Sequence, residues 1–279
     1  MNYLNKAKET NRAIHLTKDL AVDSRDVLHR LRDRLNYAEH HLHQQDMLLQ
    51  DMLALQLKQV KLPEAFNLKT EHPVAIYSDD HTHPLGTAQD NTRHPRFVGA
   101  CEKAFGGKLN VLDLGCAGGG LVWDFLLRGH RAMGLEGSDH SLISQRGMWR
   151  LLPDHLKTCD ITKPFTLDGK FHVISAWEVM EHIPEDLLPG MLANIRDHLR
   201  DDGVFVASIA TFECADEETG AVWHVTIQDR AWWIETFARH GLTLADPQPF
   251  SLADHVRGSG NGPNDWSAAL RPDMGFHLC

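Results

Sequence analysis

Runs of apolar residues alternate with amphipathic segments from Phe97 to the C-terminus. Apolar runs typical of buried strands occupy residues 109–115, 131–137, 156–161, 171–179 and 203–210. Apolar side chains at helical spacing occupy residues 120–129, 140–152, 190–200 and 229–241. Near-continuous apolar strands between amphipathic helices indicate a parallel sheet covered on both faces. The pattern therefore predicts an α/β domain.

Two further strands are predicted near the C-terminus, at residues 242–250 and 274–279, with a Gly/Asn/Pro-rich insertion between them. No amphipathic helical segment separates these two strands. Because parallel neighbours need a crossover and antiparallel ones do not, we expect an antiparallel hairpin that closes the sheet.

A different pattern precedes the α/β domain, because Thr17–Val60 contains neither Gly nor Pro. Leucine recurs at every seventh position, at Leu28, Leu35, Leu42 and Leu49. Such heptads are typical of a coiled coil or a long helical arm. The arm is expected either to pair with a second copy, giving a homo-oligomer, or to pack on the chain's own domain.

The expected domain organisation has three parts. Pro63 ends the helical arm, which spans residues 1–62. Residues 63–96 are polar and proline-rich and are expected to form a connector without secondary elements. The α/β domain follows at 97–279. Connector side chains could face a ligand, although solvent exposure is the more ordinary expectation for His81, His83, Arg93 and His94.

Charge and composition narrow the function. The chain has 279 residues, with 28 Lys and Arg against 38 Asp and Glu and a formal net charge of −10, which argues against a nucleic-acid-binding protein. No stretch approaches the roughly 18 apolar residues of a membrane span. The N-terminal segment lacks the apolar core of a signal peptide. Five cysteines without a Cys-x-x-Cys pair indicate a reducing compartment, so we expect a cytoplasmic protein.

A glycine-rich turn follows the strand predicted at 109–115. Gly115, Ala117 and Gly120 match the dinucleotide fingerprint G-x-G-x-x-G/A loosely. In that fingerprint the middle glycine lets the backbone approach a pyrophosphate, and the methyl group of Ala117 would obstruct this contact. The turn therefore predicts a nucleotide cradle but does not favour NAD.

Three carboxylates at predicted strand ends identify the ligand more closely. Asp113 suits an amino group and would repel a pyrophosphate. Glu136 can accept hydrogen bonds from both ribose hydroxyls, and Asp160 can accept one from the adenine amine. A ligand with an amino-acid end, a ribose and an adenine but no phosphate is S-adenosylmethionine.

The motifs "VLDLGCAGGG", "GLEGSD", "TCDIT", "AWEVMEHI" and "GVFVASIA" occur in an order and spacing that resemble the class I S-adenosylmethionine-dependent methyltransferases. The resemblance covers about Phe97–Cys279 and implies a Rossmann-like, mostly parallel seven-stranded sheet with an antiparallel C-terminal strand. It implies that the methionine end contacts the glycine turn, that the ribose contacts the end of the second strand, and that adenine lies beside the third. The implied cofactor-binding residues are Asp113, Gly115, Cys116, Ala117, Glu136, Gly137, Asp160, Ile161 and Trp177.

The stretch "WEVMEHIP" carries the candidate catalytic groups. Glu178, Glu181 and His182 are spaced i, i+3, i+4, so one isolated helical turn would place them on one side. The pattern E-x-x-E-H resembles the metal-binding turn of two methyltransferase subgroups, one acting on catechol-type hydroxyls and one on the terminal ribose of small RNAs. In the RNA subgroup a later histidine completes the metal site, and His224 is the candidate here.

Two interpretations of this turn stay open. Glu178, Glu181, His182 and His224 could together ligate Mg²⁺. Alternatively, His182, His224 and Glu178 act as acid–base or polar groups of the acceptor site without a metal. Of the adjacent Trp232 and Trp233, one is expected in the core and the other at the acceptor pocket.

The sequence thus predicts a methyltransferase that acts on oxygen, since a hydroxyl acceptor needs a general base or a metal to take its proton. A sugar, a glycolipid or another small molecule is the favoured acceptor. RNA ribose 2′-O-methylation, a non-catalytic cofactor-binding scaffold and a nicotinamide oxidoreductase are the alternatives.

Overall fold

The structure is a computed structural model, and it describes residues 31–32, 34, 61–76, 92–215, 219–251, 254 and 275–278. The chain divides between Val60 and Lys61. Leu31, Arg32 and Arg34 are helical and exposed. The rest of the predicted arm, with its heptads and the proposed self-association, lies outside the described residues. No helix in these ranges is long and apolar enough to cross a membrane.

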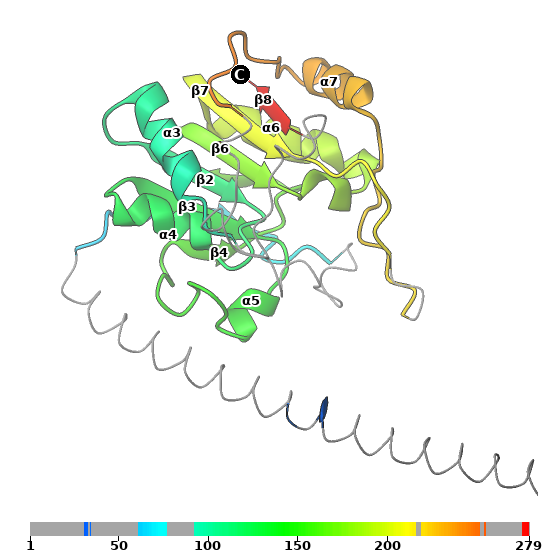
Figure 1. Cartoon of the computed structure of the whole chain (residues 1–279), viewed down its shortest axis with the longest axis horizontal. Coiled ribbons are helices and arrows are strands. Elements are labelled where there is room, and N and C mark those ends of the chain that lie inside the picture. Colours follow the sequence, from blue (N-terminus) through cyan, green and yellow to red (C-terminus); the bar gives the residue numbers. More distant parts are fainter. Residues whose placement is uncertain are drawn as a thin grey trace, which may run out of the picture. The chain divides into compact units, whose positions relative to one another are not determined.

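A six-stranded sheet forms the centre of the unit that begins at Lys61 (Figure 1). Its strands lie in the order β4-β3-β2-β6-β7-β8, and all neighbours are parallel except the antiparallel pair β7–β8. Their bounds are β2 Asn110–Leu114, β3 Arg131–Glu136, β4 Leu156–Thr158, β6 Phe171–Trp177, β7 Leu199–Ser208 and β8 Gly275–Leu278. The mostly parallel α/β architecture and the antiparallel last strand agree with the sequence prediction.

Alternating residues of each strand face two helical layers. Leu112, Leu114, Ile174 and Phe205 share a buried apolar cluster with residues of α6 and α7. The helices near this cluster are α6 Leu188–His198 and α7 Arg230–Arg239, and those across the sheet are α3 Pro95–Phe105 and α4 Gly120–Leu127 (Figure 1). The short helix α5 spans His140–Ile143, and the 3₁₀ turns η2 and η3 span Met180–His182 and Glu185–Leu187. Apolar runs that face helices on both sides explain why these strands show little polar alternation.

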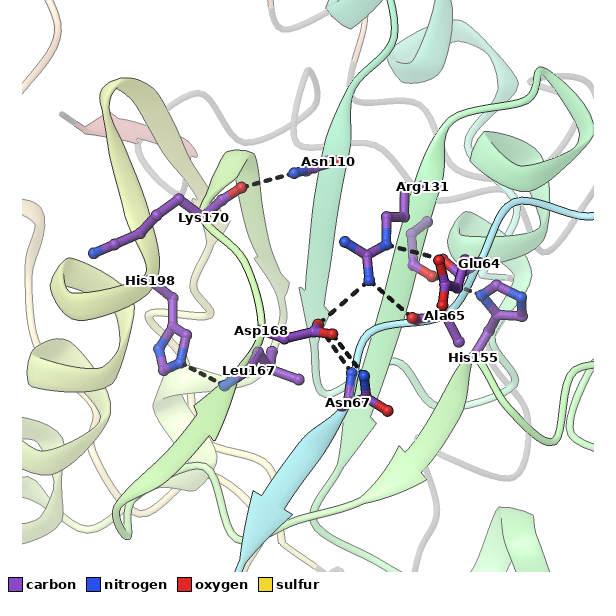
Figure 2. A network of polar contacts seen from close by, with 11 residues as sticks. Glu64, Ala65, Asn67, Asn110, Arg131, His155, Leu167, Asp168, Lys170 and His198 are labelled. Carbon is purple, nitrogen blue, oxygen red and sulfur yellow. Dashed lines mark hydrogen bonds and ion pairs between the residues drawn. The ribbon is translucent and has the colours of Figure 1, made fainter.

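A small second sheet attaches the segment that precedes the domain's first helix. Strand β1, Leu68–Thr70, pairs antiparallel with β5, Phe165–Leu167. Arg131 donates hydrogen bonds to the carbonyl oxygens of Glu64 and Ala65 and to the carboxylate of Asp168 (Figure 2). The connector predicted to lack secondary elements therefore contains a strand, and its last two residues, Pro95 and Arg96, begin α3.

The helix predicted over residues 140–152 is wrong after its first turn. Helix α5 ends at Ile143, and Gln145 and Gly147 adopt φ angles of 52° and 57°. Such left-handed residues interrupt a helix. Gly147 packs so closely on Gly118 that a Cβ there would lie 2.4 Å from the Gly118 carbonyl oxygen. Packing on the glycine turn therefore overrides the amphipathic pattern.

Of the two strands predicted for the C-terminal hairpin, the structure contains only the last one. Strand β8 pairs antiparallel with β7, but no strand forms over residues 242–250. Pro247 and Pro249 have no N–H to donate to a strand neighbour. Within the described residues the main sheet therefore has one strand fewer than the seven expected.

Candidate active site

The turn after β2 relies on left-handed backbone conformations. Gly115, Ala117 and Gly119 have φ angles of 71°, 43° and 75°. A Cβ on Gly115 would lie 2.4 Å from Cγ2 of Val179 and one on Gly119 would lie 2.5 Å from Cδ1 of Leu156, so both positions need glycine. Ala117 adopts this conformation with a side chain, which explains how alanine stands where the fingerprint has glycine.

Hydrogen bonds to three separate parts of the chain hold the glycine turn in place. The N–H groups of Gly115 and Cys116 donate to the carbonyl oxygen of Leu135, and that of Gly120 donates to Oγ1 of Thr92 at 2.7 Å. The Trp149 indole donates to the Ala117 carbonyl oxygen at 2.6 Å. Contacts within the protein therefore hold the turn, and such preorganisation lowers the ordering cost of binding.

The three strand-end carboxylates lie at the edge where the parallel strands end, which we call the carboxyl edge. Asp113 accepts a hydrogen bond from Ser175 Oγ at 2.7 Å. Glu136 accepts from the N–H of Ala117 at 2.7 Å and from that of Ser138 at 3.1 Å. All three carboxylates, that of Asp160 included, are buried. Parallel strands in register explain how residues far apart in sequence meet at one edge.

The two carboxylate oxygens of Asp160 differ in their hydrogen bonds. Its Oδ1 accepts hydrogen bonds from the N–H and the hydroxyl of Thr162, at 2.9 and 2.6 Å. No described residue donates to its Oδ2. A fixed carboxylate with one oxygen left over suits an amine donor such as that of adenine. The donor set and the fixed glycine turn therefore fit S-adenosylmethionine.

Aromatic side chains cover the end of β6. The ring centroid of Trp177 lies 4.7 Å from that of His94 and 5.1 Å from that of Phe97. His94 is 1% exposed, so the expectation that it is solvated is wrong. The N–H of His94 and the guanidinium of Arg93 both bind the buried Asp124 carboxylate of α4. Hydrogen bonds to Asp124 thus fix Arg93 and His94, with His94 beside Trp177.

The stretch "WEVMEHIP", which we call the Glu/His turn, contains a single 3₁₀ turn, η2. This agrees with the isolated turn that the sequence predicted. Glu178 precedes it with a φ of 55°, a conformation that costs energy for a side-chain-bearing residue. Its N–H donates to the Ser208 carbonyl oxygen at the end of β7. Strain of this kind concentrates at functional sites. Glu178 therefore lies outside the helical turn that was expected to contain it.

Backbone hydrogen bonds bring His224 to this turn from a distant part of the sequence. The N–H groups of Val225 and Thr226 donate to the Glu181 carbonyl oxygen at 2.8 and 3.0 Å. The Thr226 hydroxyl donates to the Ile183 carbonyl oxygen at 2.6 Å. As a result the His182 and His224 rings lie edge to face, with centroids 4.9 Å apart.

Glu181, His182 and His224 form a cluster whose potential ligand atoms all lie within 4.8 Å of one another. We call these three residues the Glu/His cluster. Glu178, the fourth residue of the predicted metal site, is not a member of it. Burial raises the pKa of Glu181 to about 8, and the charge of the nearby Glu178 carboxylate contributes to this rise.

Glu181 is fully buried, and its two carboxylate oxygens differ. Oε1 accepts from the Ala210 N–H at 2.9 Å, whereas Oε2 has no partner among the described residues. A buried carboxylate oxygen without a donor is costly unless a proton or a cation satisfies it. The cluster therefore has the chemistry of a proton-handling or cation-binding site.

Several residues at the site were not found from the sequence. Trp149 and Thr92 hydrogen-bond the glycine turn, and Ser175 hydrogen-bonds Asp113. The carbonyl oxygen of Phe212 accepts a hydrogen bond from His224 Nδ1 at 2.6 Å. These contacts join positions far apart in sequence, and no local pattern signals them. Trp233 is fully buried and Trp232 only partly so, as one of the pair was predicted to be core.

A family profile described as a methyltransferase domain matches residues 79–245. The comparison with curated proteins gave no match. Among solved structures, the Burkholderia thailandensis 1,6-didemethyltoxoflavin-N1-methyltransferase is 16% identical, with a TM-score of 0.45 over 72% of this chain and 82% of that one. Streptomyces venezuelae DesVI is 16% identical, with a TM-score of 0.46 over 71% and 94%. The glycopeptide N-methyltransferase MtfA, complexed with sinefungin, is 18% identical, with a TM-score of 0.44 over 75% and 97%.

The profile spans more than half of the chain and includes the glycine turn, the strand-end carboxylates and the Glu/His cluster. The motifs found in the sequence lie within the same residues, on β2, β3, β4, β6 and β7 and in the turns that follow these strands. The chain therefore belongs to the methyltransferase domain family, as a class I S-adenosylmethionine-dependent methyltransferase.

Proposed function

We propose that the enzyme methylates a hydroxyl oxygen of a small-molecule acceptor at the Glu/His cluster. The observation that carries this proposal is the convergence of Glu181, His182 and His224 at the carboxyl edge, next to the proposed cofactor site. Ligands of open α/β sheets bind at this edge. A hydroxyl loses a proton when it is methylated, and this cluster offers the groups that can take it.

The proposed cofactor residues divide along the carboxyl edge. Asp113 and the turn Gly115–Ala117 would hold the amino-acid end, Glu136 and Gly137 the ribose, and Asp160 and Ile161 the adenine. Trp177 would lie between the cofactor and the acceptor. When bound, S-adenosylmethionine supplies an electrophilic methyl group on a sulfonium centre.

The tautomer of His224 supports a role as general base. Its Nδ1 lies 2.6 Å from the Phe212 carbonyl oxygen, which can only accept, so Nδ1 carries the hydrogen. The basic lone pair is then on Nε2. A base held by a hydrogen bond at its other nitrogen keeps its orientation during proton transfer. We propose that His224 Nε2 takes the acceptor's hydroxyl proton.

A divalent cation is the second candidate for the same cluster. Glu181 Oε2 has no partner among the described residues, and a carboxylate oxygen of Glu181 and one ring nitrogen of each histidine all lie within 4.8 Å of one another. One carboxylate and two imidazoles suit a transition metal or Mg²⁺ with waters. A cation there would lower the pKa of a bound hydroxyl and so favour vicinal diols and catechols.

The surface beside the cluster favours a small organic acceptor over RNA. Phe212, Val222, Val225 and Ile227 are exposed apolar residues on the segments that carry or contact His224. An RNA site would instead need Lys and Arg along a phosphate track. The net charge of −10 points the same way.

The test uses S-adenosylmethionine with a deuterated methyl group, with catechol and a methyl glycoside as oxygen acceptors and their amino analogues as competitors. Mass spectrometry should find the labelled methyl on oxygen. His224→Gln and Glu181→Gln should each lower kcat at least tenfold, whereas Leu127→Ser, at the far end of α4, should not. Methylation of the amino analogues alone would refute the choice of oxygen.

The cation is tested separately by titrating Mn²⁺ and following its electron paramagnetic resonance signal. We expect one bound ion per chain in the wild type and none in Glu181→Gln. If Mn²⁺ does not bind while turnover persists in EDTA, the cluster works by acid–base chemistry without a metal.

A further inference from the structure

The segment His72–Ile76, which we call the strap, lies at the carboxyl edge although the methyltransferase profile begins after it. The Asp160 N–H donates to the His72 carbonyl oxygen at 2.8 Å. The Ala75 N–H donates to the Gly137 carbonyl oxygen at 2.9 Å. The strap therefore joins the two strand-end loops that the proposed function assigns to adenine and ribose.

The strap is anchored firmly upstream. Arg131 binds the carbonyl oxygens of Glu64 and Ala65, and Asn67 donates to Asp168 through its backbone and its side chain (Figure 2). Strand β1 then pairs with β5. At its own beginning, the His72 N–H donates to Thr70 Oγ1 at 3.0 Å. The path of the chain to the carboxyl edge is thus set by hydrogen bonds at each stage.

Side chains of the strap differ sharply in burial. Ala75 is 6% exposed, and its Cβ lies 3.2 Å from where a Cβ on Gly137 would be, so the backbones approach closely. Ile76, the next residue, is 83% exposed. Among the described residues no other large apolar side chain is as exposed. Ile76 therefore exposes apolar surface directly after the hydrogen-bonded Ala75, and such surface gains free energy when a flat apolar ligand covers it.

We infer that the strap forms part of the nucleoside end of the cofactor site and that Ile76 provides apolar surface to the adenine. The inference rests on the proposed assignment of Glu136, Gly137 and Asp160. It adds residues from outside the matched domain to the cofactor site. A side chain on Gly137 would press on Ala75 and move the strap slightly away from the loop proposed to bind the ribose.

The experiment measures Kd by isothermal titration calorimetry of the full chain with S-adenosylhomocysteine. A second titration uses 5′-methylthioadenosine, which has the nucleoside but no amino-acid end. Ile76→Ser should raise the Kd for both ligands by the same factor, about three- to tenfold. Ile76→Leu should restore wild-type affinity. Leu127→Ser is the matched control, since Leu127 is 54% exposed at the C-terminal end of α4, away from the carboxyl edge.

An unchanged Kd in Ile76→Ser, or an equal change in Leu127→Ser, would overturn the inference. A loss for S-adenosylhomocysteine without a loss for 5′-methylthioadenosine would also overturn it, because the effect would then arise at the amino-acid end. Failure of the wild type to bind either ligand would instead refute the proposed cofactor site itself.

Discussion

Val179 occupies the space that a side chain on Gly115 would need, so the glycine turn touches the start of the Glu/His turn. Glu178, directly before Val179, has a left-handed φ of 55°. The two proposed halves of the site, for cofactor and for acceptor, therefore meet through one pair of residues. A shift in either half should be felt in the other.

Gly115→Ala tests this contact. The new methyl group would lie 2.4 Å from Val179 Cγ2 and the backbone would keep a left-handed φ, so both sterics and conformation oppose it. We expect the free energy of unfolding to fall by roughly 1–3 kcal/mol, measured by urea denaturation. We also expect weaker binding of S-adenosylhomocysteine. Wild-type stability and affinity would show that the contact relaxes without cost.

Glu181→Gln separates function from stability at the cluster. The substitution removes a buried carboxylate whose Oε2 has no partner among the described residues. In EDTA, thermal melting should give a melting temperature no lower than that of the wild type, because glutamine keeps the volume and an oxygen for the Ala210 N–H and removes a carboxylate whose ionisation burial opposes. Turnover should fall at least tenfold. A large drop in melting temperature would instead assign Glu181 a structural role.

At the residue scale, the sequence could predict side chains at strand ends. Asp113, Glu136 and Asp160 lie near the C-terminal ends of apolar runs, and parallel strands bring their ends to one edge. His94, Trp149 and Ala75 could not be found in this way. Their positions depend on contacts across the fold, which leave no periodicity in the local sequence.

Helix α7 offers a test at the scale of one element. Asp229 is its N-cap, and the carboxylate accepts from the Trp232 N–H at 2.8 Å. Asp229→Ala should lower the free energy of unfolding by about 1 kcal/mol, whereas Asp229→Ser should lose much less. Equal stability of Asp229→Ala and wild type in urea would show that the cap contributes nothing.

His198 links the end of α6 to β5 and makes stability depend on pH. Burial lowers the pKa of His198, partly offset by its hydrogen bond to the Asn194 carbonyl oxygen. Its Nε2 accepts from the Leu167 N–H, which requires the neutral ring. The unfolded chain therefore binds more protons, so this contribution is present above the ordinary histidine pKa and is lost as pH falls below it.

Urea denaturation at pH 7.5 and pH 5 should accordingly show lower stability in acid. The pH dependence should be smaller in His198→Gln, which lacks the titrating group. If the variant has the same pH dependence as the wild type, the acid sensitivity arises elsewhere, for example at His155, whose pKa burial also lowers.

At the element scale, apolar periodicity predicted all the parallel strands and most of the helices, and it missed the short antiparallel pair β1 and β5. It failed over residues 140–152, where Gly147 packs on Gly118 and the chain leaves the helix. It also failed over 242–250, where prolines occupy a segment with suitable apolar spacing. In both places a backbone requirement outweighs the side-chain pattern.

At the scale of the whole molecule, the ordered set of motifs predicted the family, because a parallel sheet places every motif at one edge. The order of the motifs does not predict which acceptor the enzyme methylates. The segment carrying Phe212 and His224, where we propose that the acceptor binds, reaches η2 through hydrogen bonds to Glu181 and Ile183. The bonds that fasten this segment had no signal in the sequence.

The most direct test of the account is thermal melting of the full chain with S-adenosylhomocysteine, with NAD and without ligand. The account predicts that S-adenosylhomocysteine at a hundredfold excess over its Kd stabilises the protein by about 2.7 kcal/mol, and that NAD gives no shift. Asp160→Asn should reduce the shift. No stabilisation by S-adenosylhomocysteine, or an equal stabilisation by NAD, would contradict the assignment of the carboxyl edge as an S-adenosylmethionine site.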